Sequence, residues 1–183
     1  MMRLNESVTA VMTPLGREDR SFIDDFLRVH GPCRGGEILA VGLERGATFV
    51  ELCRRGGNAR VVGLDDNSER VEVCAERARQ AGLAHRLRVE TGDAKMLPFA
   101  NGRFEAVVSL DAIHELPDPA PVLSEMLRVV APGGTVFVRD YAGTDGELTV
   151  EEIRTIVREL GLRDPVVSLT ADQAWTWVAV RPG

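Results

Sequence analysis

The order of strand-like and helix-like segments constrains this chain more than any other feature of its sequence. From residue 37 on, short continuous apolar runs alternate with longer segments whose apolar residues recur at every third or fourth position. Continuous apolar runs indicate strands that are covered on both faces. We interpret the order as a strand–helix unit repeated five times, which predicts a doubly wound, mostly parallel α/β sheet with helices on both faces. The expected strands are EILAVG, RVVGLD, LRVE, FEAVVSL and TVFVRD.

Most of the expected helices have recognisable ends. Their apolar residues fall on one side, as a helix that covers a sheet requires. Side-chain oxygens can cap the amino ends, and glycines commonly follow the carboxyl ends. We expect helices over 21–30, 47–55, 67–82, 120–130 and 149–161, with Ser21, Asp66 or Asn67, and Thr149 as amino-terminal caps and Gly161 as one stop.

The end of the chain departs from this alternation. Two strand-like runs, PVVSL and AWTWVAV, are separated only by a short turn, so they must pair antiparallel as a hairpin. A nicotinamide-binding sheet of the usual kind is all parallel, which argues against that class. With this ending, the chain resembles the class I S-adenosylmethionine-dependent methyltransferases over roughly residues 35–181. The resemblance implies a Rossmann-like fold with an antiparallel last strand, in which residues 35–183 bind S-adenosylmethionine. We expect residues 1–34 to form a helical lid segment of the same single domain.

Composition and charge narrow the class of partner. The 183 residues are 44% hydrophobic and 27% charged, with a formal net charge of −6. An acidic chain gains no counterion-release energy from phosphates, so we expect no nucleic-acid partner. The first 16 residues contain no continuous apolar run, and no stretch is long enough to span a bilayer. We therefore expect a cytoplasmic protein with no membrane partner.

The cysteines and histidines give no sequence signal for a metal site. Cys33, Cys53 and Cys74 are odd in number and include no C-x-x-C pair, so we expect no zinc. Cys53 and Cys74 fall in helix patterns and are expected in the core, with a soft-metalloid site built from all three cysteines as the alternative. His30 and His85 are isolated and are expected at the surface.

A glycine-containing turn joins the first strand to the next helix. Glycines let the backbone approach a ligand closely, and a helix amino end favours a carboxylate. The resemblance implies that Gly42, Leu43, Glu44 and Gly46 contact the methionine and ribose portions of the cofactor. Two residues depart from the family pattern, because Ala40 stands where an acid often occurs and Glu44 replaces the middle glycine. Glu44 is expected to face the cofactor's ammonium or to fill part of the pocket, and an ordinary strand–helix turn is the alternative.

Acidic residues follow the second and third strands. The resemblance implies that Asp65 accepts hydrogen bonds from the ribose hydroxyls, and a helix cap is the alternative. It also implies that Asp93 accepts from the adenine amino group, with Gly92 and Ala94 completing that turn. Asp66 is assigned to the same site, although the family often has an apolar residue there. An ordinary Gly-Asp turn is the alternative for residues 92–93.

The carboxyl ends of the fourth and fifth strands are expected to hold the reacting groups, because ligands of open α/β sheets bind at that edge. Ser109 should lie near the sulfonium methyl. Asp111 and His114 are candidates to bind or deprotonate the methyl acceptor. Tyr141 is a candidate to hydrogen-bond that acceptor, with packing at a strand end as the alternative.

The expected function is methyl transfer from S-adenosylmethionine to a small-molecule acceptor. A degenerate, non-catalytic subunit that binds the cofactor or a partner protein is the alternative, and a nicotinamide-dependent oxidoreductase is a third. Only YAGTDGEL separates the fifth strand from the next helix, so the pocket needs another cover. We expect either residues 1–30 or the second subunit of a homodimer to provide it.

Overall fold

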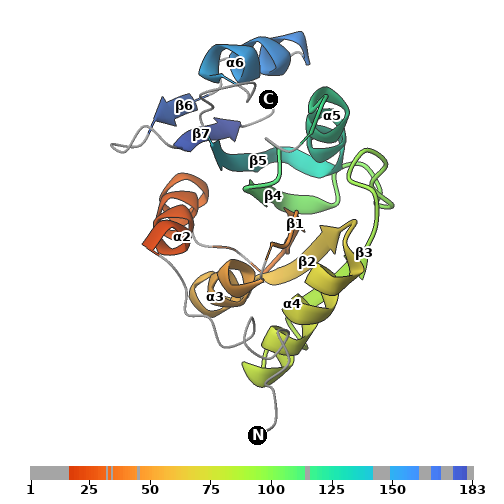
Figure 1. Cartoon of the computed structure of the whole chain (residues 1–183). Helices are drawn as coiled ribbons and strands as arrows, with labels where there is room; N and C mark the ends of the chain where they lie inside the picture. Colours follow the sequence, from red (N-terminus) through yellow and green to blue (C-terminus); the bar gives the residue numbers. More distant parts are fainter. Residues whose placement is uncertain are drawn as a thin grey trace, which may run out of the picture.

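The computed structural model describes residues 17–31, 33, 35–44, 46–113, 116–141, 149–160, 166–169 and 175–180. Within these residues the chain forms one seven-stranded sheet and five helices (Figure 1). The strands are β1 (Glu37–Val41), β2 (Arg60–Asp65), β3 (Leu87–Thr91), β4 (Phe104–Leu110), β5 (Val130–Tyr141), β6 (Val166–Leu169) and β7 (Trp175–Val180). The helices are α2 (Arg17–His30), α3 (Ala47–Arg55), α4 (Ser68–Gln80), α5 (Ala120–Val129) and α6 (Val150–Glu159).

The strand order places a topological switch point in the middle of the sheet. Neighbouring strands follow the order β3-β2-β1-β4-β5-β7-β6, so the chain winds one way from β1 to β3 and the other way from β4 onward. β1 pairs in parallel with both β2 and β4. Ligands of such sheets bind outside the carboxyl ends of the strands where the winding reverses. The fold therefore predicts a ligand site at the ends of β1 and β4.

Alternating residues of the central strands feed two apolar layers. On β1, Ile38 and Ala40 belong to one layer, whereas Leu39 and Val41 belong to the other. Helices α2, α3 and α4 pack on the first layer, and α5 packs on the second with residues of α6 (Figure 1). Because both faces are covered, all four of these side chains are buried. The prediction of a doubly wound sheet with helices on both faces is confirmed.

The predicted antiparallel hairpin at the end of the chain is also confirmed. β7 runs antiparallel to β6, and it pairs antiparallel with β5 on its other side. Asn67 caps α4, because its side chain accepts from the backbone amides of the first turn. Thr149 caps α6 in a reciprocal box, in which Thr149 accepts from the backbone of Glu152 and the Glu152 carboxylate accepts from the backbone of Thr149. Gly161, the predicted stop of α6, lies outside the described residues.

Two predicted boundaries and the count of strand–helix units are wrong. Helix α2 begins at Arg17, so Ser21 lies inside the helix and is not its cap, since arginine and glutamate among the residues just before it are good helix formers. The chain between β3 and β4 forms turns and no helix, because glycine and proline recur through residues 92–103. The strand–helix unit therefore fails after the third strand. β5 begins early, at Val130, and includes the predicted Pro-Gly-Gly turn of residues 132–134, where its register with β4 shifts.

Helix α2 is a core element. The side chains of Phe22 and Phe26 are fully buried, and their rings meet Phe137 of β5 edge to face at centroid distances of 5.4 and 5.7 Å. α2 therefore forms part of the helical layer, and the predicted lid is left to residues 1–16. These residues lie outside the described part of the chain, and the lid stays a prediction.

His30 is not the surface residue that the sequence predicted. Its ring is half-buried and stacks on Phe26 at a centroid distance of 5.1 Å. Its Nδ1 lies 3.2 Å from the hydroxyl oxygen of Thr135 on β5. The end of α2 is thus fixed to the sheet by a contact between residues far apart in the sequence. His85 is exposed, as predicted.

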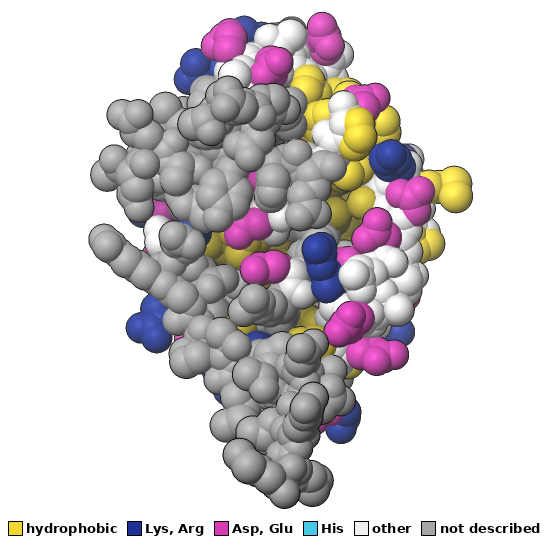
Figure 2. Space-filling model, viewed as in Figure 1, with side chains coloured by type: hydrophobic (Ala, Val, Ile, Leu, Met, Phe, Trp, Pro, Cys, Tyr) yellow, Lys and Arg dark blue, Asp and Glu magenta, His cyan; other side chains and the backbone are white. Residues whose placement is uncertain are grey.

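The described surface mixes charges of both signs. Figure 2 shows acidic and basic side chains next to one another on the visible face. Among the described residues, helical pairs of opposite charge include Arg28 with Asp25 at 2.8 Å and Arg54 with Glu51 at 3.4 Å. Such exposed pairs contribute about 0–1 kcal/mol each. Among the described helices, none combines the length and the apolar character needed to cross a membrane.

All three cysteines are free and buried, which confirms the core prediction for Cys53 and Cys74. Burial raises the pKa of the Cys53 thiol to about 11 and that of Cys74 to about 12. A thiol in the unfolded chain titrates at about 8.5, so folding holds these protons through a wide alkaline window.

We therefore expect the free energy of unfolding to fall as the pH rises above about 9. Between that pH and about 12, Cys74 stays protonated in the folded state and ionises in the unfolded state. In this range, each pH unit lowers the free energy of unfolding by up to about 1.4 kcal/mol for such a thiol. Urea unfolding at several pH values measures the slope, and Cys74→Ala should reduce it. An identical slope in the variant would contradict the expectation.

Candidate functional site

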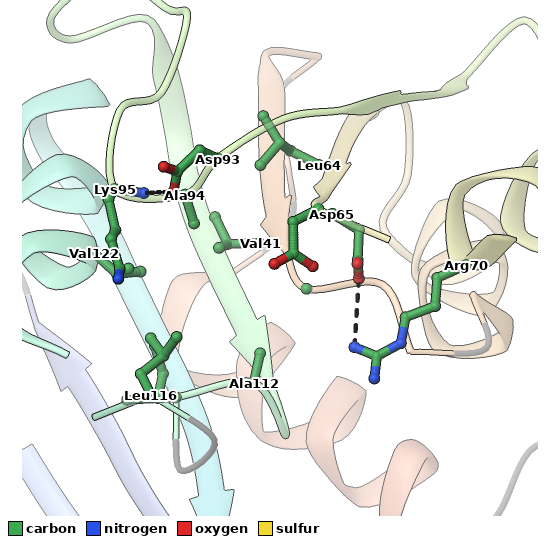
Figure 3. A pocket seen from close by; sticks show the side chains of 13 residues that line it. Val41, Leu64, Asp65, Arg70, Asp93, Ala94, Lys95, Ala112, Leu116 and Val122 are labelled. Atoms are coloured by element: carbon green, nitrogen blue, oxygen red, sulfur yellow. Dashed lines mark hydrogen bonds and ion pairs between the residues drawn. The ribbon is translucent and has the colours of Figure 1, made fainter. Parts of the chain in front are cut away.

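A cavity of about 470 Å³ lies at the carboxyl edge of the sheet, beside the switch point between β1 and β4. This volume is within the usual range for small-molecule sites. Apolar residues at strand ends and acidic residues of the following turns line it (Figure 3). Of the residues that the sequence predicted, Gly42, Asp65, Asp66, Asp93 and Ala94 line this cavity.

The turn after β1 leaves no space for a side chain at its first position. Gly42 has a φ of 78°, and a Cβ placed there would lie 2.4 Å from the Cβ of Ala112. Glu44 has a φ of 45°, in the left-handed region that glycine adopts without strain. The Glu44 side chain is exposed and does not line the cavity, so the structure gives no support to the idea that it fills the pocket. Glu44 therefore replaces glycine at a backbone position that favours glycine.

Leu43 and Gly46 shape this turn from behind the cavity. The Leu43 side chain is fully buried, and a Cβ at Gly63 of β2 would lie 2.6 Å from it. A Cβ at Gly46 would lie 2.6 Å from the sulfur of Cys74 on α4. Neither Leu43 nor Gly46 is among the described residues that line the cavity. Their close contacts hold the turn against β2 and α4.

Asp65 connects the glycine turn to the start of α4. Its side chain is only 4% exposed. One carboxylate oxygen accepts from the backbone amide of Leu43 at 2.7 Å, and the other accepts from the amide of Asn67 at 2.9 Å. Arg70 approaches the first oxygen at 3.9 Å (Figure 3). These partners hold the carboxylate in one orientation at the wall of the cavity.

The turn after β3 brings a second carboxylate to the same cavity. Asp93 is exposed, and its Oδ1 accepts from the backbone amide of Lys95 at 2.8 Å. Gly92 donates its backbone amide to the carbonyl of Asp65 at 3.0 Å. A Cβ at Gly92 would lie 2.8 Å from Leu64, so glycine permits this close approach. The structure thus brings together the two aspartates that the sequence predicted as one site.

Arg128 of α5 holds the loop between β3 and β4. Its guanidinium donates to the carbonyls of Leu97 and Phe99 at 2.9 and 2.7 Å and to the side chain of Asn101 at 2.9 Å. Glu125, one helical turn earlier, binds Arg128 through two contacts of 2.6 Å. The Glu125 carboxylate also accepts from the backbone amide of Leu97 at 2.8 Å. These two residues fix the loop that carries Asp93.

The turn after β4 is strained and tied to β5. Asp111 has a φ of 56°, and its backbone amide donates to the carbonyl of Arg139 at 3.0 Å. The backbone amide of Ile113 donates to the buried Asp140 carboxylate at 2.6 Å. A positive φ at a residue with a side chain costs about 1–2 kcal/mol and persists only where the surroundings fix it. The hydrogen bonds to β5 are the contacts that fix this turn.

Two of the predicted reacting residues, Ser109 and Asp111, lie outside the described lining of the cavity. Ser109 is fully buried, its hydroxyl has no hydrogen-bond partner among the described residues, and it does not line the cavity. Asp111 is half-buried and is likewise outside the described lining. His114 lies outside the described residues. Tyr141 ends β5, as predicted, and the structure describes only that backbone position.

The sequence missed the basic residues of the cavity. Arg70 and Lys95 line it together with three aspartates, so the described lining has a slight excess of negative charge. Arg70 lies in the first turn of α4, where no motif singled it out. The apolar wall of Ala112, Ile113, Leu116 and Val122 was also missed, although the position of residues 112–113 directly after β4 could have indicated it.

The sheet order, the antiparallel β7 and the cavity at the ends of β1 and β2 define the class I methyltransferase fold. The sequence comparison agrees, because residues 39–138 match the methyltransferase domain family. This match covers more than half of the chain, and the chain belongs to that family. The resemblance predicted from the sequence is confirmed, with S-adenosylmethionine as the cofactor of the family.

Curated relatives match the chain over less than half of its length. Norajmaline N-methyltransferase of Rauvolfia serpentina is 30% identical over 82 residues, which cover 44% of this chain and 28% of that protein. Methyltransferase GfsG of Streptomyces halstedii is 31% identical over 84 residues, which cover 46% and 29%. The chain thus spans less than a third of the length of these relatives.

Solved structures share the whole fold at low sequence identity. A SAM-dependent methyltransferase of Aquifex aeolicus superposes with a TM-score of 0.76 at 21% identity, covering 86% of this chain and 88% of that one. Phosphoethanolamine N-methyltransferase 2 of Haemonchus contortus, solved with S-adenosyl-L-methionine, superposes with a TM-score of 0.79 at 18% identity. This superposition covers 90% of this chain and 53% of that one. The [4+2]-cyclase SpnF superposes with a TM-score of 0.77 at 21% identity, covering 90% of this chain and 80% of that one. This fold therefore also occurs in a protein named for a different reaction.

Proposed function

We propose that this chain binds S-adenosylmethionine in the cavity at the carboxyl edge and transfers its methyl group to a small-molecule acceptor. The observation that carries the proposal is the buried carboxylate of Asp65 at the cavity wall. A carboxylate has about four acceptor positions, and the backbone amides of Leu43 and Asn67 use two. The remaining capacity is suited to the ribose hydroxyls.

The other lining residues fit the remaining parts of this cofactor. Gly42 lines the cavity, where its backbone can contact the methionine portion. Asp93 would accept from the adenine amino group, and the apolar side chains of Leu116 and Val122 suit a flat apolar ring. The slight negative charge of the lining favours a ligand that carries a sulfonium and an ammonium.

When bound, the cofactor supplies a methyl group that already has a good leaving group. The chain then mainly has to orient the acceptor and exclude water. A general base is needed only for a protonated acceptor, and Asp111 and His114 are our candidates for it. Tyr141 is our candidate to bind the acceptor.

The proposal of a small-molecule acceptor is supported by the relatives, which are named as methyltransferases of small compounds such as norajmaline. The mixed surface charge in Figure 2 differs from the basic stripe typical of nucleic-acid-binding proteins. The homodimer and the cytoplasmic location stay predictions.

A non-catalytic subunit is the second candidate function. The departures from the family pattern at Ala40, Glu44 and Asp66 favour it, because each changes a residue that usually serves the cofactor. Ala40 is buried in the layer under α2, α3 and α4, so no acidic side chain reaches the cavity from that position.

A thermal-shift series with S-adenosylmethionine, S-adenosylhomocysteine and NAD distinguishes these functions. We expect both adenosyl compounds to raise Tm, by an amount that corresponds to about 2.7 kcal/mol when the ligand is at 100 times its Kd. NAD should have no effect. The absence of any shift would contradict cofactor binding, and a shift without turnover across a library of acceptors would favour the non-catalytic subunit.

The Glu44→Gly variant tests what the departure in the glycine turn does. We expect it to stabilise the fold by about 1 kcal/mol, because glycine relieves the left-handed backbone at this position. We also expect weaker binding of S-adenosylhomocysteine if the carboxylate faces the cofactor's ammonium. Urea unfolding and calorimetry measure the two effects separately. Tighter binding would refute the ammonium contact.

A further inference from the structure

A second group of polar side chains lies at the amino edge of the sheet, opposite the cavity. It consists of His30 at the end of α2, Cys33 in the segment before β1, and Glu105 near the start of β4. One nitrogen, one sulfur and one carboxylate oxygen from these residues lie within 4.8 Å of one another. The residues of β4 rise about 3.3 Å each, so the length of the strand separates this group from the cavity.

We propose that His30, Cys33 and Glu105 form a binding site for a divalent transition-metal ion of borderline softness, such as Zn²⁺. Imidazole nitrogen, thiolate sulfur and carboxylate oxygen are the three protein donors that Zn²⁺ accepts. Three protein ligands leave a fourth position for water or another ligand. A modest contraction of the 4.8 Å spacing would bring the donors to coordination distance.

The surroundings of Glu105 support this site. Its Oε1 is buried and has no hydrogen-bond partner among the described residues. A buried acceptor without a partner costs about 1–3 kcal/mol, and a bound cation would supply the missing partner. A Cβ at Gly36 would lie 2.6 Å from the other carboxylate oxygen, so glycine leaves the space that this carboxylate occupies.

The ring of His30 is held in place for coordination. Its Nδ1 lies 3.2 Å from the Thr135 hydroxyl, and its face stacks on Phe26. In the tautomer with the proton on Nδ1, the Nε2 atom carries the lone pair that a metal ion requires. Metal-bound histidines commonly donate their second ring nitrogen to an oxygen acceptor, as this geometry permits.

Cys33 would change its protonation on binding. Burial, and then the nearby Glu105 carboxylate, raise the pKa of the Cys33 thiol to about 11. The thiol is therefore protonated at neutral pH in the absence of a metal. An ion that binds as a thiolate complex must displace that proton, so coordination should release about one proton per site.

The test uses the full, reduced chain after treatment with a chelator. Titration with Zn²⁺ should show one ion per chain, about one proton released and a raised Tm. Titration with Co²⁺ should produce a thiolate-to-cobalt charge-transfer band. No stoichiometric binding of either ion, or Co²⁺ binding without that band, would overturn the proposal.

Matched variants locate the site. Cys33→Ala should weaken Zn²⁺ binding at least about 100-fold and Glu105→Gln at least about tenfold, since even indirect partners of metal ligands contribute 10–100-fold. Cys74→Ala and His85→Ala should bind like the parent chain. Glu105→Gln keeps the side-chain shape and decides the matter if Cys33→Ala does not fold. Unchanged Zn²⁺ binding in Glu105→Gln would overturn the proposal. The shift of Tm with S-adenosylhomocysteine tests the cavity at the other edge of the sheet independently.

Discussion

Replacing Asp65 with asparagine is expected to weaken the binding of S-adenosylhomocysteine by about 10²–10⁴-fold. Two charge-assisted hydrogen bonds to the ribose are worth about 1.5–3 kcal/mol each, and their loss converts to this range of Kd. The substitution also places an amide NH₂ at one of the two oxygens that accept from the backbone amides of Leu43 and Asn67. We therefore expect the free energy of unfolding to fall by about 1–3 kcal/mol as well.

Asp66→Asn is the matched control, because it makes the same change of charge on the neighbouring residue. Asp66 lines the cavity but is exposed, so its charge is screened by water. Its affinity for S-adenosylhomocysteine should change by less than about tenfold. Calorimetry under conditions in which both variants are folded gives the comparison. Similar affinities in the Asp65 and Asp66 variants would remove the basis of the proposed site.

Replacing Arg128 with alanine is expected to lower the free energy of unfolding by about 2–4 kcal/mol and to weaken cofactor binding. The guanidinium holds two carbonyls and one side chain of the loop between β3 and β4, and its loss leaves these acceptors and Glu125 without their partner. Hydrogen bonds to a charged donor contribute about 1.5–3 kcal/mol each and are not additive. Asp93 lies on this loop, so the loss should reach the adenine end of the cavity.

Arg28→Ala provides the control for this prediction.

Results

Sequence analysis

The order of strand-like and helix-like segments constrains this chain more than any other feature of its sequence. From residue 37 on, short continuous apolar runs alternate with longer segments whose apolar residues recur at every third or fourth position. Continuous apolar runs indicate strands that are covered on both faces. We interpret the order as a strand–helix unit repeated five times, which predicts a doubly wound, mostly parallel α/β sheet with helices on both faces. The expected strands are EILAVG, RVVGLD, LRVE, FEAVVSL and TVFVRD.

Most of the expected helices have recognisable ends. Their apolar residues fall on one side, as a helix that covers a sheet requires. Side-chain oxygens can cap the amino ends, and glycines commonly follow the carboxyl ends. We expect helices over 21–30, 47–55, 67–82, 120–130 and 149–161, with Ser21, Asp66 or Asn67, and Thr149 as amino-terminal caps and Gly161 as one stop.

The end of the chain departs from this alternation. Two strand-like runs, PVVSL and AWTWVAV, are separated only by a short turn, so they must pair antiparallel as a hairpin. A nicotinamide-binding sheet of the usual kind is all parallel, which argues against that class. With this ending, the chain resembles the class I S-adenosylmethionine-dependent methyltransferases over roughly residues 35–181. The resemblance implies a Rossmann-like fold with an antiparallel last strand, in which residues 35–183 bind S-adenosylmethionine. We expect residues 1–34 to form a helical lid segment of the same single domain.

Composition and charge narrow the class of partner. The 183 residues are 44% hydrophobic and 27% charged, with a formal net charge of −6. An acidic chain gains no counterion-release energy from phosphates, so we expect no nucleic-acid partner. The first 16 residues contain no continuous apolar run, and no stretch is long enough to span a bilayer. We therefore expect a cytoplasmic protein with no membrane partner.

The cysteines and histidines give no sequence signal for a metal site. Cys33, Cys53 and Cys74 are odd in number and include no C-x-x-C pair, so we expect no zinc. Cys53 and Cys74 fall in helix patterns and are expected in the core, with a soft-metalloid site built from all three cysteines as the alternative. His30 and His85 are isolated and are expected at the surface.

A glycine-containing turn joins the first strand to the next helix. Glycines let the backbone approach a ligand closely, and a helix amino end favours a carboxylate. The resemblance implies that Gly42, Leu43, Glu44 and Gly46 contact the methionine and ribose portions of the cofactor. Two residues depart from the family pattern, because Ala40 stands where an acid often occurs and Glu44 replaces the middle glycine. Glu44 is expected to face the cofactor's ammonium or to fill part of the pocket, and an ordinary strand–helix turn is the alternative.

Acidic residues follow the second and third strands. The resemblance implies that Asp65 accepts hydrogen bonds from the ribose hydroxyls, and a helix cap is the alternative. It also implies that Asp93 accepts from the adenine amino group, with Gly92 and Ala94 completing that turn. Asp66 is assigned to the same site, although the family often has an apolar residue there. For Gly92 and Asp93, the alternative is an ordinary Gly-Asp turn without a ligand.

The carboxyl ends of the fourth and fifth strands are expected to hold the reacting groups, because ligands of open α/β sheets bind at that edge. Ser109 should lie near the sulfonium methyl. Asp111 and His114 are candidates to bind or deprotonate the methyl acceptor. Tyr141 is a candidate to hydrogen-bond that acceptor, with packing at a strand end as the alternative.

The expected function is methyl transfer from S-adenosylmethionine to a small-molecule acceptor. A degenerate, non-catalytic subunit that binds the cofactor or a partner protein is the alternative, and a nicotinamide-dependent oxidoreductase is a third. Only YAGTDGEL separates the fifth strand from the next helix, so the pocket needs another cover. We expect either residues 1–30 or the second subunit of a homodimer to provide it.

Overall fold

The computed structural model describes residues 17–31, 33, 35–44, 46–113, 116–141, 149–160, 166–169 and 175–180. Within these residues the chain forms one seven-stranded sheet and five helices (Figure 1). The strands are β1 (Glu37–Val41), β2 (Arg60–Asp65), β3 (Leu87–Thr91), β4 (Phe104–Leu110), β5 (Val130–Tyr141), β6 (Val166–Leu169) and β7 (Trp175–Val180). The helices are α2 (Arg17–His30), α3 (Ala47–Arg55), α4 (Ser68–Gln80), α5 (Ala120–Val129) and α6 (Val150–Glu159).

The strand order places a topological switch point in the middle of the sheet. Neighbouring strands follow the order β3-β2-β1-β4-β5-β7-β6, so the chain winds one way from β1 to β3 and the other way from β4 onward. β1 pairs in parallel with both β2 and β4. Ligands of such sheets bind outside the carboxyl ends of the strands where the winding reverses. The fold therefore predicts a ligand site at the ends of β1 and β4.

Alternating residues of the central strands feed two apolar layers. On β1, Ile38 and Ala40 belong to one layer, whereas Leu39 and Val41 belong to the other. Helices α2, α3 and α4 pack on the first layer, and α5 packs on the second with residues of α6 (Figure 1). Because both faces are covered, all four of these side chains are buried. The prediction of a doubly wound sheet with helices on both faces is confirmed.

The predicted antiparallel hairpin at the end of the chain is also confirmed. β7 runs antiparallel to β6, and it pairs antiparallel with β5 on its other side. Asn67 caps α4, because its side chain accepts from backbone amides of the first turn. Thr149 caps α6 in a reciprocal box, in which Thr149 accepts from the backbone of Glu152 and the Glu152 carboxylate accepts from the backbone of Thr149. Gly161, the predicted stop of α6, lies outside the described residues.

Two predicted boundaries and the count of strand–helix units are wrong. Helix α2 begins at Arg17, so Ser21 lies inside the helix and is not its cap, since arginine and glutamate among the residues just before it are good helix formers. The chain between β3 and β4 forms turns and no helix, because glycine and proline recur through residues 92–103. The strand–helix unit therefore fails after the third strand. β5 begins early, at Val130, and includes the predicted Pro-Gly-Gly turn of residues 132–134, where its register with β4 shifts.

Helix α2 is a core element. The side chains of Phe22 and Phe26 are fully buried, and their rings meet Phe137 of β5 edge to face at centroid distances of 5.4 and 5.7 Å. α2 therefore forms part of the helical layer, and the predicted lid is left to residues 1–16. These residues lie outside the described part of the chain, and the lid stays a prediction.

His30 is not the surface residue that the sequence predicted. Its ring is half-buried and stacks on Phe26 at a centroid distance of 5.1 Å. Its Nδ1 lies 3.2 Å from the hydroxyl oxygen of Thr135 on β5. The end of α2 is thus fixed to the sheet by a contact between residues far apart in the sequence. His85 is exposed, as predicted.

The described surface mixes charges of both signs. Figure 2 shows acidic and basic side chains next to one another on the visible face. Among the described residues, helical pairs of opposite charge include Arg28 with Asp25 at 2.8 Å and Arg54 with Glu51 at 3.4 Å. Such exposed pairs contribute about 0–1 kcal/mol each. Among the described helices, none combines the length and the apolar character needed to cross a membrane.

All three cysteines are free and buried, which confirms the core prediction for Cys53 and Cys74. Burial raises the pKa of the Cys53 thiol to about 11 and that of Cys74 to about 12. A thiol in the unfolded chain titrates at about 8.5, so the folded chain holds these protons through a wide alkaline window.

We therefore expect the free energy of unfolding to fall as the pH rises above about 9. Between that pH and about 12, Cys74 stays protonated in the folded state and ionises in the unfolded state. In this range, each pH unit lowers the free energy of unfolding by up to about 1.4 kcal/mol for such a thiol. Urea unfolding at several pH values measures the slope, and Cys74→Ala should reduce it. An identical slope in the variant would contradict the expectation.

Candidate functional site

A cavity of about 470 Å³ lies at the carboxyl edge of the sheet, beside the switch point between β1 and β4. This volume is within the usual range for small-molecule sites. Apolar residues at strand ends and acidic residues of the following turns line it (Figure 3). Of the residues that the sequence predicted, Gly42, Asp65, Asp66, Asp93 and Ala94 line this cavity.

The turn after β1 leaves no space for a side chain at its first position. Gly42 has a φ of 78°, and a Cβ placed there would lie 2.4 Å from the Cβ of Ala112. Glu44 has a φ of 45°, in the left-handed region that glycine adopts without strain. The Glu44 side chain is exposed and does not line the cavity, so the structure gives no support to the idea that it fills the pocket. Glu44 therefore replaces glycine at a backbone position that favours glycine.

Leu43 and Gly46 shape this turn from behind the cavity. The Leu43 side chain is fully buried, and a Cβ at Gly63 of β2 would lie 2.6 Å from it. A Cβ at Gly46 would lie 2.6 Å from the sulfur of Cys74 on α4. Neither Leu43 nor Gly46 is among the described residues that line the cavity. Their close contacts hold the turn against β2 and α4.

Asp65 connects the glycine turn to the start of α4. Its side chain is buried. One carboxylate oxygen accepts from the backbone amide of Leu43 at 2.7 Å, and the other accepts from the amide of Asn67 at 2.9 Å. Arg70 approaches the first oxygen at 3.9 Å (Figure 3). These partners hold the carboxylate in one orientation at the wall of the cavity.

The turn after β3 brings a second carboxylate to the same cavity. Asp93 is exposed, and its Oδ1 accepts from the backbone amide of Lys95 at 2.8 Å. Gly92 donates its backbone amide to the carbonyl of Asp65 at 3.0 Å. A Cβ at Gly92 would lie 2.8 Å from Leu64, so glycine permits this close approach. The structure thus brings together the two aspartates that the sequence predicted as one site.

Arg128 of α5 holds the loop between β3 and β4. Its guanidinium donates to the carbonyls of Leu97 and Phe99 at 2.9 and 2.7 Å and to the side chain of Asn101 at 2.9 Å. Glu125, one helical turn earlier, binds Arg128 through two contacts of 2.6 Å. The Glu125 carboxylate also accepts from the backbone amide of Leu97 at 2.8 Å. These two helix residues fix the loop that carries the second aspartate.

The turn after β4 is strained and tied to β5. Asp111 has a φ of 56°, and its backbone amide donates to the carbonyl of Arg139 at 3.0 Å. The backbone amide of Ile113 donates to the buried Asp140 carboxylate at 2.6 Å. A positive φ at a residue with a side chain costs about 1–2 kcal/mol and persists only where the surroundings fix it. The hydrogen bonds to β5 are contacts that fix this turn.

Two of the predicted reacting residues, Ser109 and Asp111, lie outside the described lining of the cavity. Ser109 is fully buried, its hydroxyl has no hydrogen-bond partner among the described residues, and it does not line the cavity. Asp111 is half-buried and is likewise outside the described lining. His114 lies outside the described residues. Tyr141 ends β5, as predicted, and the structure describes only that backbone position.

The sequence missed the basic residues of the cavity. Arg70 and Lys95 line it together with three aspartates, so the described lining has a slight excess of negative charge. Arg70 lies in the first turn of α4, where no motif singled it out. The sequence also missed an apolar wall, whose first two members directly follow β4 and could have been inferred from that position. This wall consists of Ala112, Ile113, Leu116 and Val122.

The sheet order, the antiparallel β7 and the cavity at the ends of β1 and β2 define the class I methyltransferase fold. The sequence comparison agrees, because residues 39–138 match the methyltransferase domain family. This match covers more than half of the chain, and the chain belongs to that family. The resemblance predicted from the sequence is confirmed, with S-adenosylmethionine as the cofactor of the family.

Curated relatives match the chain over less than half of its length. Norajmaline N-methyltransferase of Rauvolfia serpentina is 30% identical over 82 residues, which cover 44% of this chain and 28% of that protein. Methyltransferase GfsG of Streptomyces halstedii is 31% identical over 84 residues, which cover 46% and 29%. The chain thus spans less than a third of the length of these relatives.

Solved structures share the fold at low sequence identity. A SAM-dependent methyltransferase of Aquifex aeolicus superposes with a TM-score of 0.76 at 21% identity, covering 86% of this chain and 88% of that one. Phosphoethanolamine N-methyltransferase 2 of Haemonchus contortus, solved with S-adenosyl-L-methionine, superposes with a TM-score of 0.79 at 18% identity. This superposition covers 90% of this chain and 53% of that one. The [4+2]-cyclase SpnF superposes with a TM-score of 0.77 at 21% identity, covering 90% of this chain and 80% of that one. This fold therefore also occurs in a protein named for a different reaction.

Proposed function

We propose that this chain binds S-adenosylmethionine in the cavity at the carboxyl edge and transfers its methyl group to a small-molecule acceptor. The observation that carries the proposal is the buried carboxylate of Asp65 at the cavity wall. A carboxylate has about four acceptor positions, and the backbone amides of Leu43 and Asn67 use two. The remaining capacity is suited to the ribose hydroxyls.

The other lining residues fit the remaining parts of this cofactor. Gly42 lines the cavity, where its backbone can contact the methionine portion. Asp93 would accept from the adenine amino group, and the apolar side chains of Leu116 and Val122 suit a flat apolar ring. The slight negative charge of the lining favours a ligand that carries a sulfonium and an ammonium.

When bound, the cofactor supplies a methyl group that already has a good leaving group. The chain then mainly has to orient the acceptor and exclude water. A general base is needed only for a protonated acceptor, and Asp111 and His114 are our candidates for it. Tyr141 is our candidate to bind the acceptor.

A small-molecule acceptor is supported by the relatives, since norajmaline N-methyltransferase is named for a small compound. The mixed surface charge in Figure 2 differs from the basic stripe typical of nucleic-acid-binding proteins. The homodimer and the cytoplasmic location stay predictions.

A non-catalytic subunit is the second candidate function. The departures from the family pattern at Ala40, Glu44 and Asp66 favour it, because each changes a residue that usually serves the cofactor. Ala40 is buried in the layer under α2, α3 and α4, so no acidic side chain reaches the cavity from that position.

A thermal-shift series with S-adenosylmethionine, S-adenosylhomocysteine and NAD distinguishes these functions. We expect both adenosyl compounds to raise Tm, by an amount that corresponds to about 2.7 kcal/mol when the ligand is at about 100 times its Kd. NAD should have no effect. The absence of any shift would contradict cofactor binding, and a shift without turnover across a library of acceptors would favour the non-catalytic subunit.

The Glu44→Gly variant tests what the departure in the glycine turn does. We expect it to stabilise the fold by about 1 kcal/mol, because glycine relieves the left-handed backbone at this position. We also expect weaker binding of S-adenosylhomocysteine, because we propose that the Glu44 carboxylate faces the cofactor's ammonium. Urea unfolding and calorimetry measure the two effects separately. Tighter binding would refute the ammonium contact.

A further inference from the structure

A second group of polar side chains lies at the amino edge of the sheet, opposite the cavity. It consists of His30 at the end of α2, Cys33 in the segment before β1, and Glu105 near the start of β4. One nitrogen, one sulfur and one carboxylate oxygen from these residues lie within 4.8 Å of one another. Strand residues rise about 3.3 Å each, so most of the length of β4 separates this group from the cavity.

We propose that His30, Cys33 and Glu105 form a binding site for a divalent transition-metal ion of borderline softness, such as Zn²⁺. Imidazole nitrogen, thiolate sulfur and carboxylate oxygen are the three kinds of protein donor that Zn²⁺ accepts. Three protein ligands leave a fourth position for water or another ligand. A modest contraction of the 4.8 Å spacing would bring the donors to coordination distance.

The surroundings of Glu105 support this site. Its Oε1 is buried and has no hydrogen-bond partner among the described residues. A buried acceptor without a partner is unfavourable, and a bound cation would supply the missing partner. A Cβ at Gly36 would lie 2.6 Å from the other carboxylate oxygen, so glycine leaves the space that this carboxylate occupies.

The ring of His30 is held in place for coordination. Its Nδ1 lies 3.2 Å from the Thr135 hydroxyl, and its face stacks on Phe26. In the tautomer with the proton on Nδ1, the Nε2 atom carries the lone pair that a metal ion requires. Metal-bound histidines commonly donate their second ring nitrogen to an oxygen acceptor, as this geometry permits.

Cys33 would change its protonation on binding. Burial, and then the nearby Glu105 carboxylate, raise the pKa of the Cys33 thiol to about 11. The thiol is therefore protonated at neutral pH in the absence of a metal. An ion that binds as a thiolate complex must displace that proton, so coordination should release about one proton per site.

The test uses the full, reduced chain after treatment with a chelator. Titration with Zn²⁺ should show one ion per chain, about one proton released and a raised Tm. Titration with Co²⁺ should produce a thiolate-to-cobalt charge-transfer band. No stoichiometric binding of either ion, or Co²⁺ binding without that band, would overturn the proposal.

Matched variants locate the site. Cys33→Ala should weaken Zn²⁺ binding at least about 100-fold and Glu105→Gln at least about tenfold, since even indirect partners of metal ligands contribute about 10–100-fold. Cys74→Ala and His85→Ala should bind like the parent chain. Glu105→Gln keeps the side-chain shape and decides the matter if Cys33→Ala does not fold. Unchanged Zn²⁺ binding in Glu105→Gln would overturn the proposal. The shift of Tm with S-adenosylhomocysteine tests the cavity at the other edge of the sheet independently.

Discussion

Replacing Asp65 with asparagine is expected to weaken the binding of S-adenosylhomocysteine by about 10²–10⁴-fold, because two charge-assisted hydrogen bonds to the ribose are worth about 1.5–3 kcal/mol each. The substitution also places an amide NH₂ at one of the two oxygens that accept from the backbone amides of Leu43 and Asn67. We therefore expect the free energy of unfolding to fall by about 1–3 kcal/mol as well.

Asp66→Asn is the matched control, because it makes the same change of charge on the neighbouring residue. Asp66 lines the cavity but is exposed, so its charge is screened by water. Its affinity for S-adenosylhomocysteine should change by less than about tenfold. Calorimetry under conditions in which both variants are folded gives the comparison. Similar affinities in the Asp65 and Asp66 variants would remove the basis of the proposed site.

Replacing Arg128 with alanine is expected to lower the free energy of unfolding by about 2–4 kcal/mol and to weaken cofactor binding. The guanidinium holds two carbonyls and one side chain of the loop between β3 and β4, and its loss leaves these acceptors and Glu125 without their partner. Hydrogen bonds to a charged donor are strong, but contributions within one network do not add. Asp93 lies on this loop, so the loss should reach the adenine end of the cavity.

Arg28→Ala provides the control for this prediction. Arg28 also pairs with an acid one turn earlier in its helix, but its side chain is 73% exposed. Its loss should change the free energy of unfolding by less than about 1 kcal/mol. Arg128→Lys keeps the charge without the planar set of donors and should give an intermediate result. Equal urea midpoints for Arg28→Ala and Arg128→Ala would show that the loop contacts contribute nothing.

The Glu125–Arg128 pair should also affect how stability depends on pH in acid. The hydrogen bond from Arg128 lowers the pKa of Glu125 below its ordinary value of 4.5. Because the folded-state pKa is the lower one, this stabilisation is present above the ordinary value and is lost as the pH falls through the lowered value. Glu125→Gln should therefore flatten the dependence of stability on pH below about 4.5. If the dependence of stability on acidic pH is the same in that variant, the stabilising role of the Glu125–Arg128 hydrogen bond is contradicted.

The strands were predictable because burial on both faces leaves a local signature. The continuous apolar run that ends at Val41 indicates a strand covered on both faces without any knowledge of the strands beside it. The absence of a helix before the last strand likewise predicted the antiparallel pairing of β7 with β6. The start of α2 was mispredicted, because helix propensity and caps are weaker local signals than apolar periodicity.

The site was predictable only where a residue ends a strand. Asp65 ends β2 and Asp93 lies just after β3, so the parallel sheet itself brings them to one edge. Arg70 and Lys95 escaped prediction because nothing local distinguishes a basic residue that faces a cavity from one that faces solvent. Ser109 sits at the expected edge but is buried away from the cavity, because the pleat of β4 turns its side chain into the packed interior.

The sequence by itself determined which segments become strands and which aspartates reach the carboxyl edge, since both depend on periodicity along the chain. Only the tertiary structure decided which side chains meet. The hydrogen bond between Asp65 and the Leu43 amide joins two different strand ends, and the group of His30, Cys33 and Glu105 joins a helix, a loop and a strand. Such contacts require the sheet order β2-β1-β4, which no single segment encodes.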